Sequence, residues 1–447
     1  MKKKHVFILL FIIFIIAITL VISRSKKIYT VQDGNIGISI EQISNMIEKR
    51  AYHQSSLMEN GNILITGGYD SDKSKGLLST EIFDVKSKKF IKGPNMNLPH
   101  YGHKQFSLKN GSIIIVDLNG VELYSPLTNK FELFKDTLYE RFNRIDNNSN
   151  WKDSVNITEL KTGNILVTGG VEYLYPPGTS IPDYKIISKA EVIDPVAKKI
   201  YEIDNMKYPR AHHSSIVLPS GDVLLISGIK DLKQTIKERR FVLNDTIERF
   251  SPKTKTFTTL STTITPSFNP FVYYLNNNLI IFDGPINPQR GDNLKNGTYQ
   301  IINLQTLEQQ KKEYNEKLWL DNFHSKMFQV NESEFLSFYY LRNKNEFLSC
   351  PSITSLSPYI TYIDIKNNNY LKIKSKISPN SNIIKLSENK FLITGGNRYK
   401  DSLYTKVLKC SFSSNYNLYY SDFYINTNDL SLPNSYIIRI IKNNRGR

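Results

Sequence analysis

The feature that most constrains the fold of this chain is a short pattern that recurs along it. A Gly or Asn turn precedes a run of apolar residues, and the clearest copies end in glycine. Repetition at a steady spacing predicts a repeat architecture rather than the two or three separate domains that length alone suggests. The clear copies lie at 59–68, 161–170, 219–228 and 387–396, and weaker ones at 109–116, 276–284 and 330–337.

Each copy is typical of a tight hairpin that leads into a buried strand. Gly and Asn tolerate the positive φ that such hairpins need, and a continuous apolar run favours a strand covered on both faces. Glycine at the end of the strand lets the backbone approach neighbouring elements closely. We expect this structural role for Gly67, Gly68, Gly169, Gly170, Gly228, Gly395 and Gly396.

A second pattern follows the first and indicates strand, polar turn and strand, as in 81–84 before Phe90 and 191–195 before Ile200. Each unit therefore has four strands, a sheet that cannot bury both of its faces alone. Seven such units at a period of about 50 residues predict an all-β propeller with seven four-stranded blades. The register positions are His53, His103, Val155, His213, Asn269, His324 and Ser381, spaced by 50–58 residues.

Three motifs carry a resemblance to a known family. Arg50-x-x-His53, Pro209-Arg210-x-x-His213 and Glu191-x-x-Asp194-Pro195 are similar to the two halves of kelch repeats. Phe, Ile or Tyr replaces the tryptophan that usually ends the second half. The resemblance covers nearly all of residues 50–420 and implies a kelch-type β-propeller, distantly similar to the galactose oxidase and kelch superfamily.

Secondary structure is also expected in the segments outside the repeats. Residues 28–49 are expected to be a linker with a short helix, because Ile40, Ile43 and Ile47 have helical spacing. Residues 421–447 are expected to be a C-terminal tail. Its run at 436–441 predicts a strand that joins a terminal blade and closes the ring.

The N-terminus predicts a membrane segment. Lysines precede an apolar run from Val6 to Ile22, and Arg24, Lys26 and Lys27 follow it. The run is longer than the apolar core of a cleaved signal peptide, so residues 1–27 are expected to be an uncleaved signal-anchor with one transmembrane helix. Cleavage near Ser23, which would release a secreted protein, is the alternative. Both interpretations place the propeller outside the cytoplasm.

Charge and cysteine content narrow the classes of partner. The formal net charge is +17, but the lysines are dispersed along the chain, whereas nucleic-acid proteins concentrate their charge. Nucleic acid is therefore not expected as a partner. The two cysteines, Cys350 and Cys410, are too few for a disulfide framework or a zinc site.

Ligand binding is expected in the loops between the second and third strands of the blades, because these vary most in length and composition. Aromatic side chains there suit sugars or peptides, and paired arginines suit carboxylates or phosphates. Solvated surface loops are the alternative interpretation. The candidate ligand-binding residues are Tyr173, Tyr175, Lys233, Lys237, Arg239 and Arg240.

Histidine is a common metal ligand, and the register histidines share one position in the repeat. We expect them to make structural hydrogen bonds in each blade, since Val155, Asn269 and Ser381 would interrupt a metal-binding ring. The stretch around Tyr52 and His53 also resembles the copper-ligand region of the galactose oxidase family, which implies these two as ligands. That site needs a cross-linked Tyr–Cys pair and another His from a C-terminal domain, and neither is expected here. No metal and no cofactor is therefore expected.

Three functions remain open from the sequence. The favoured one is a membrane-anchored module that binds protein or carbohydrate, because no set of catalytic residues was identified. The second is an exported enzyme, either a copper oxidase or a sugar mutarotase or epimerase. The third is a structural scaffold in an envelope complex. A propeller fold does not decide among them.

Overall fold

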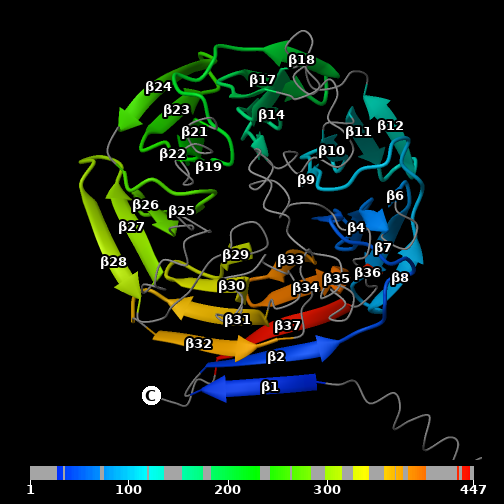
Figure 1. The fold of residues 1–447 in the computed structure, drawn as a ribbon. Helices are drawn as coiled ribbons and strands as arrows, with labels where there is room; N and C mark the ends of the chain where they lie inside the picture. The colour runs from blue at the N-terminus through cyan, green and yellow to red at the C-terminus, as the bar shows by residue number, and fades with distance from the viewer. Residues whose placement is uncertain are drawn as a thin grey trace, which may run out of the picture.

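In a computed structural model, the chain forms a seven-bladed β-propeller around one axis (Figure 1). This confirms the all-β fold and the number of blades. No α-helix lies in the described residues, which contain no helix long and apolar enough to cross a membrane. The expected signal-anchor at 1–27 lies outside them. The described residues are 28–33, 36–70, 75–117, 120–134, 154–174, 183–231, 242–261, 264–282, 297–314, 326–341, 357–367, 369–375, 381–398, 430–431 and 435–442.

Blades 1 to 6 are antiparallel sheets of four strands, named here from the axis outward. Blade 1 has β3 (Gln54–Leu57), β4 (Ile63–Thr66), β7 (Thr80–Asp84) and β8 (Lys89–Lys92). Blade 2 has β9 (Lys104–Ser107), β10 (Ile113–Asp117), β11 (Gly120–Ser125) and β12 (Lys130–Phe134). Blade 3 has β13 (Asn156–Glu159), β14 (Ile165–Thr168), β17 (Ala190–Asp194) and β18 (Lys199–Glu202).

The next three blades repeat this order. Blade 4 has β19 (Ser214–Val217), β20 (Val223–Ile226), β23 (Ile247–Ser251) and β24 (Thr256–Ser261). Blade 5 has β25 (Phe271–Leu275), β26 (Asn278–Phe282), β27 (Gly297–Asn303) and β28 (Gln309–Tyr314). Blade 6 has β29 (Lys326–Gln329), β30 (Glu334–Leu341), β31 (Ser357–Asp364) and β32 (Asn369–Lys374).

Blade 7 closes the ring with both ends of the chain. Its inner strands are β33 (Asn382–Ser387) and β34 (Lys390–Thr394), followed by β37 (Ser435–Lys442). β2 (Ile36–Gln42) pairs with β37, and β1 (Ile28–Asp33) is a fifth strand at the outer edge. Figure 1 shows the C-terminal strand beside the two N-terminal ones. The strand expected at 436–441 is thus present as β37.

The expectation of a helix within 28–49 is wrong. Residues 36–42 form β2, and no helix follows before Arg50. Within β2, Ile38 is fully buried and faces its partner Ile440 across the ladder. Ile36, Ile38 and Ile40 recur with a period of two, which is the repeat of a strand. The propeller therefore includes strands on both sides of the expected 50–420 range.

The core is a ring of apolar clusters, one between each pair of neighbouring blades. Between blades 1 and 2, for example, Leu64 of β4 packs with Ile113 and Ile115 of β10. The alternate residues of β4, Ile63 and Ile65, face blade 7 instead. Both faces of each second strand are therefore buried, which explains why these strands are continuously apolar in the sequence.

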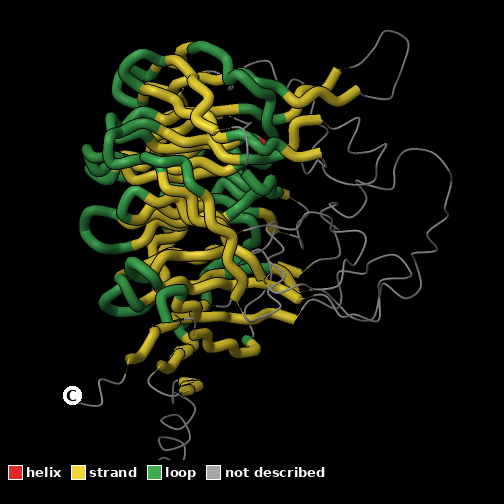
Figure 2. The backbone as a smooth tube through the Cα atoms, turned by 90° about the vertical axis from the view of Figure 1, so that its left-hand side faces the viewer, coloured by secondary structure: helices red, strands yellow, loops and turns green. Residues whose placement is uncertain are grey.

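The two faces of the propeller differ. The hairpin face carries the turns between the first and second strands of the blades, whereas the ribbon face carries two-stranded extensions of the loops between the second and third strands. Figure 2 shows these ribbons projecting on one side. They are β5 (Tyr69–Asp70) with β6 (Lys75–Gly76), β15 (Val171–Leu174) with β16 (Asp183–Ile186), β21 (Ile229–Asp231) with β22 (Val242–Leu243), and β35 (Asn397–Arg398) with β36 (Leu430–Ser431).

Candidate functional site

Blades 1 and 4 each begin with a buried arginine. Arg50 is fully buried and donates to the carbonyl of Gly67 at 2.6 Å and to the Glu81 carboxylate at 2.9 Å. Arg210 repeats the arrangement, with its Nε 3.0 Å from the Glu248 carboxylate. A charge removed from water needs a partner of opposite charge, and here each arginine also satisfies backbone carbonyls. These residues hold the blade together and are not exposed to a ligand.

Blade 2 replaces the arginine with histidine. His100 lies 3.1 Å from the Glu122 carboxylate through Nε2 and 2.9 Å from the Asp117 carboxylate through Nδ1. Burial opposes its protonation, but the two acids outweigh burial and raise the pKa of His100 to about 9. His100 is therefore a cation at neutral pH and, like the arginines, pairs with buried carboxylates.

Three of the register histidines contact a threonine of the preceding blade. Nε2 of His103 lies 2.7 Å from Oγ1 of Thr66, and His213 contacts Thr168 in the same way at 2.9 Å. His53 contacts Thr394 across the closure of the ring, at 2.8 Å. These contacts fit the expected structural role of the histidines, whereas His324 lies outside the described residues.

Burial determines the charge of these histidines. It lowers the pKa of His53, His103 and His213 well below the usual value, and nearby Arg50, His100 and Arg210, respectively, lower it further. The three imidazoles are therefore neutral at physiological pH. They form hydrogen bonds between blades without bringing charge into the core.

The residues implied as copper ligands lie in this structural layer. Tyr52 has a positive φ of 56°, and His53 is 1% exposed and contacts Thr394. In the described part of the chain, no group of three or more His, Cys, Asp or Glu side chains could hold a metal ion. Cys350 and Cys410 lie outside that part.

Glycines at the ends of second strands lie close to the start of the next blade. Gly169 has a φ of +64°, and a Cβ there would lie 2.1 Å from the carbonyl oxygen of Arg210. Gly67 is equivalent, with a Cβ position 2.1 Å from the carbonyl oxygen of His100. Only glycine allows the start of the next blade to approach this closely.

Of the candidate ligand-binding residues, only Tyr173 lies in the described part of the chain, at the ribbon face. Tyr173 lies in β15, opposite Tyr184 of β16. Ribbons of neighbouring blades contact each other: β16 contacts β21, and β36 contacts β5. The other candidates, Tyr175, Lys233, Lys237, Arg239 and Arg240, lie outside the described residues.

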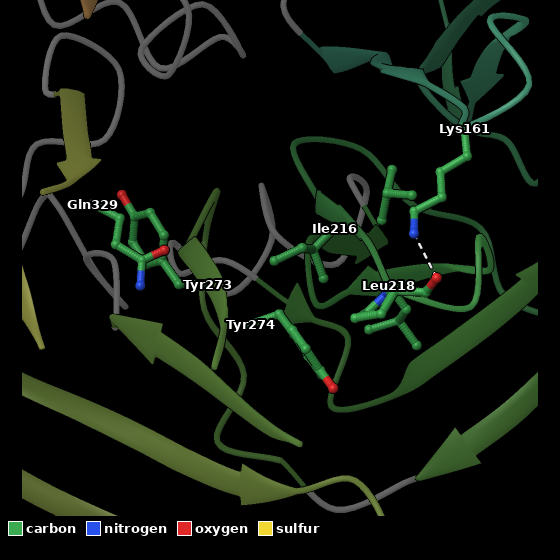
Figure 3. A pocket seen from close by; sticks show the side chains of 8 residues that line it. Lys161, Ile216, Leu218, Tyr273, Tyr274 and Gln329 are labelled. Carbon is green, nitrogen blue, oxygen red and sulfur yellow. Dashed lines mark hydrogen bonds between the residues drawn. The ribbon is translucent and has the colours of Figure 1, made fainter. Parts of the chain in front are cut away.

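Sequence reasoning missed a pocket on the hairpin face. It has a volume of about 370 Å³ and lies along the innermost strands of blades 4 and 5 (Figure 3). The signal that could have indicated it is the composition of β25, in which an inner strand contains Phe, Val and two Tyr residues. The lining residues are Lys161, Ile216, Val217, Leu218, Pro219, Tyr273, Tyr274 and Gln329.

Comparisons with known proteins do not assign this chain to a family. No protein-family model matches the chain, and no curated protein matches it. Among solved structures, the chain is similar to the structure of YjhT at 10% sequence identity and a TM-score of 0.44. That similarity covers 90% of this chain and 99% of YjhT. The strand pairing described above establishes the seven-bladed propeller independently of it.

Proposed function

We propose that this chain is a kelch-type binding module, anchored to a membrane by residues 1–27, with its propeller outside the cytoplasm. Its ligand would be a protein or a carbohydrate held at the ribbon face. The observation that carries the proposal is the meeting of ribbons from neighbouring blades, β16 with β21 and β36 with β5. Each pair of ribbons presents a variable surface on a rigid frame, which is where propellers and other scaffolds usually bind.

The frame itself supports binding rather than chemistry. The buried Arg210 and His213 are engaged by Glu248 and Thr168. They therefore stabilise the contacts within and between blades and are not available to a substrate. At the ribbon face, recognition would then depend on residues that project from the frame, as those of the ribbons do.

The test uses charge reversal on the ribbons. Lys75, Lys185 and Lys230 are exposed ribbon residues, and the triple variant to glutamate should abolish capture of ligands found with the full-length protein on carbohydrate and peptide arrays. The matched control reverses three exposed lysines on outer strands, Lys92, Lys130 and Lys199. Equal binding by both triple variants would contradict the assignment to the ribbon face.

Membrane topology has its own test. If residues 28–447 are outside the cytoplasm, protease added to intact cells should degrade the propeller while a cytoplasmic marker survives. Carbonate extraction should leave the chain in the membrane if residues 1–27 anchor it, and release it if the segment is cleaved. A propeller that is protected from external protease would contradict the proposed location.

A further inference from the structure

The pocket on the hairpin face has a rigid apolar wall. Ile216 and Leu218 of blade 4 line it, together with Tyr273 and Tyr274 of β25 (Figure 3). The two tyrosines are consecutive in the strand and point in opposite directions, with Tyr273 toward Gln329. The Tyr273 ring packs 4.9 Å from that of Phe335 in blade 6, measured between centroids. Burial raises the pKa of Tyr273, so its hydroxyl stays protonated. The wall therefore offers apolar surface without negative charge.

The two ends of the pocket are polar and differ in kind. At one end, Lys161 donates from Nζ to the carbonyl oxygen of Pro219. That carbonyl is neutral, and no carboxylate of the described residues pairs with Lys161. At the other end, the backbone carbonyl of Gln329 accepts from Lys385 at 2.6 Å, but within the described part of the chain its side-chain carboxamide makes no hydrogen bond. A charge and an amide thus remain available to a ligand.

We propose that this pocket binds a carboxylate carried on an apolar body. Lys161 would pair with the carboxylate, the apolar wall would bury the body, and Gln329 would take a polar group at the far end. Its volume lies within the range of small-ligand sites, which are mostly apolar with a few placed polar groups. A neutral sugar fits this lining less well, because its many hydroxyls would be desolvated without partners.

The site is distinct from the ribbon face, since Lys161 and Pro219 belong to the hairpin turns at the opposite end of the blades. Two sources of the ligand share this chemistry: a free small acid, and the C-terminal residue of a peptide. Blade 2 supplies a natural control. Lys109 occupies the equivalent turn position and donates to the carbonyl of Lys161 at 2.7 Å, but it does not line the pocket.

The experiment measures binding to the full-length protein by titration calorimetry. The probes are 3-phenylpropionate and N-acetyl-leucyl-phenylalanine, each compared with its primary amide. A charge-assisted hydrogen bond contributes about 1.5–3 kcal/mol, so at least one acid should bind about tenfold or more tightly than its amide. Lys161→Met keeps the apolar stem and should remove this preference, whereas Lys109→Met should keep it.

The outcomes separate the sources and the two proposed sites. Binding of the free acid alone identifies a small-molecule site, and binding of the peptide alone identifies recognition of a C-terminus. Failure of both acids to bind, amides that bind as tightly as acids, or a Lys161→Met variant that retains the preference would each overturn the proposal. The ribbon variant of Lys75, Lys185 and Lys230 should bind these probes normally, so failure at one face does not imply failure at the other.

Discussion

His213 contacts Thr168 across the boundary between blades 3 and 4, with Nε2 2.9 Å from Oγ1. The residues are 45 positions apart in the sequence, and both are almost completely buried. At the boundary between blades 2 and 3 the equivalent positions hold Val116 and Val155, which pack in one apolar cluster. The contacts of His53, His103 and His213 thus join their blades with a polar pair, whereas blades 2 and 3 are joined here by an apolar pair.

This alternation predicts coupling between the two positions. Thr168→Val leaves the His213 imidazole buried without its partner and should lower the free energy of unfolding by about 1–3 kcal/mol. Thr168→Val combined with His213→Val recreates the valine pair and should cost less than the sum of the single changes. Denaturant unfolding of the four proteins measures the coupling. As a control, Thr168→Val with His103→Val should be additive, and coupling of similar size there would refute the pairwise explanation.

Close approach of the blades predicts a contrast between two glycines. Gly169 and Gly163 both have positive φ, but a Cβ at Gly163 would meet no atom within 4 Å. Gly169→Ala adds a clash with the Arg210 carbonyl to the shared backbone strain, and should cost about 1–3 kcal/mol more than Gly163→Ala. Thermal unfolding compares them directly. If the two variants melt at the same temperature, Gly169 is not needed for the contact between blades 3 and 4.

The charge of His100 predicts a loss of stability at alkaline pH. Its pKa in the folded protein is raised to about 9, above the unfolded value of about 6.5, so its stabilising effect is full below pH 6.5 and disappears as pH rises through 9. The difference in unfolding free energy between the wild type and His100→Gln should shrink by about 3 kcal/mol between pH 6 and pH 10. Denaturant titrations across this range measure it. A pH-independent difference would mean that His100 is neutral in the fold.

Closure of the ring predicts different results for two N-terminal truncations. Removing residues 1–35 deletes the proposed anchor and, of the described strands, only β1 at the outer edge, and should leave a folded propeller. Removing residues 1–42 also deletes β2, with buried Ile38 and the ion pair between Glu41 and Lys88 at 2.7 Å. The edge of β37 is then exposed, which favours aggregation. Size-exclusion chromatography and circular dichroism should show a monomer for the first truncation and aggregated or unfolded protein for the second.

The sequence by itself determined the propeller and the spacing of its blades. The apolar runs are continuous because each second strand is covered on both faces, as Leu64 and Ile65 illustrate by facing blades 2 and 7. The glycines were equally readable, because a position such as Gly169 has no room for a Cβ. These features are local and recur, so one chain contains several independent copies of the same signal.

Only the tertiary structure decided the features that depend on distant partners. Strand spacing at Ile36, Ile38 and Ile40 overlaps helical spacing at Ile40, Ile43 and Ile47. Pairing of β2 with β37, roughly 400 residues away, decides in favour of the strand at 36–42. The pocket likewise joins Lys161, Tyr273 and Gln329 from three blades, and no one segment contains its pattern. The partners of Thr168 and Arg210 could not be predicted from the sequence for the same reason. The contacts of a side chain in this ring depend on which blade lies beside it once the ring has closed.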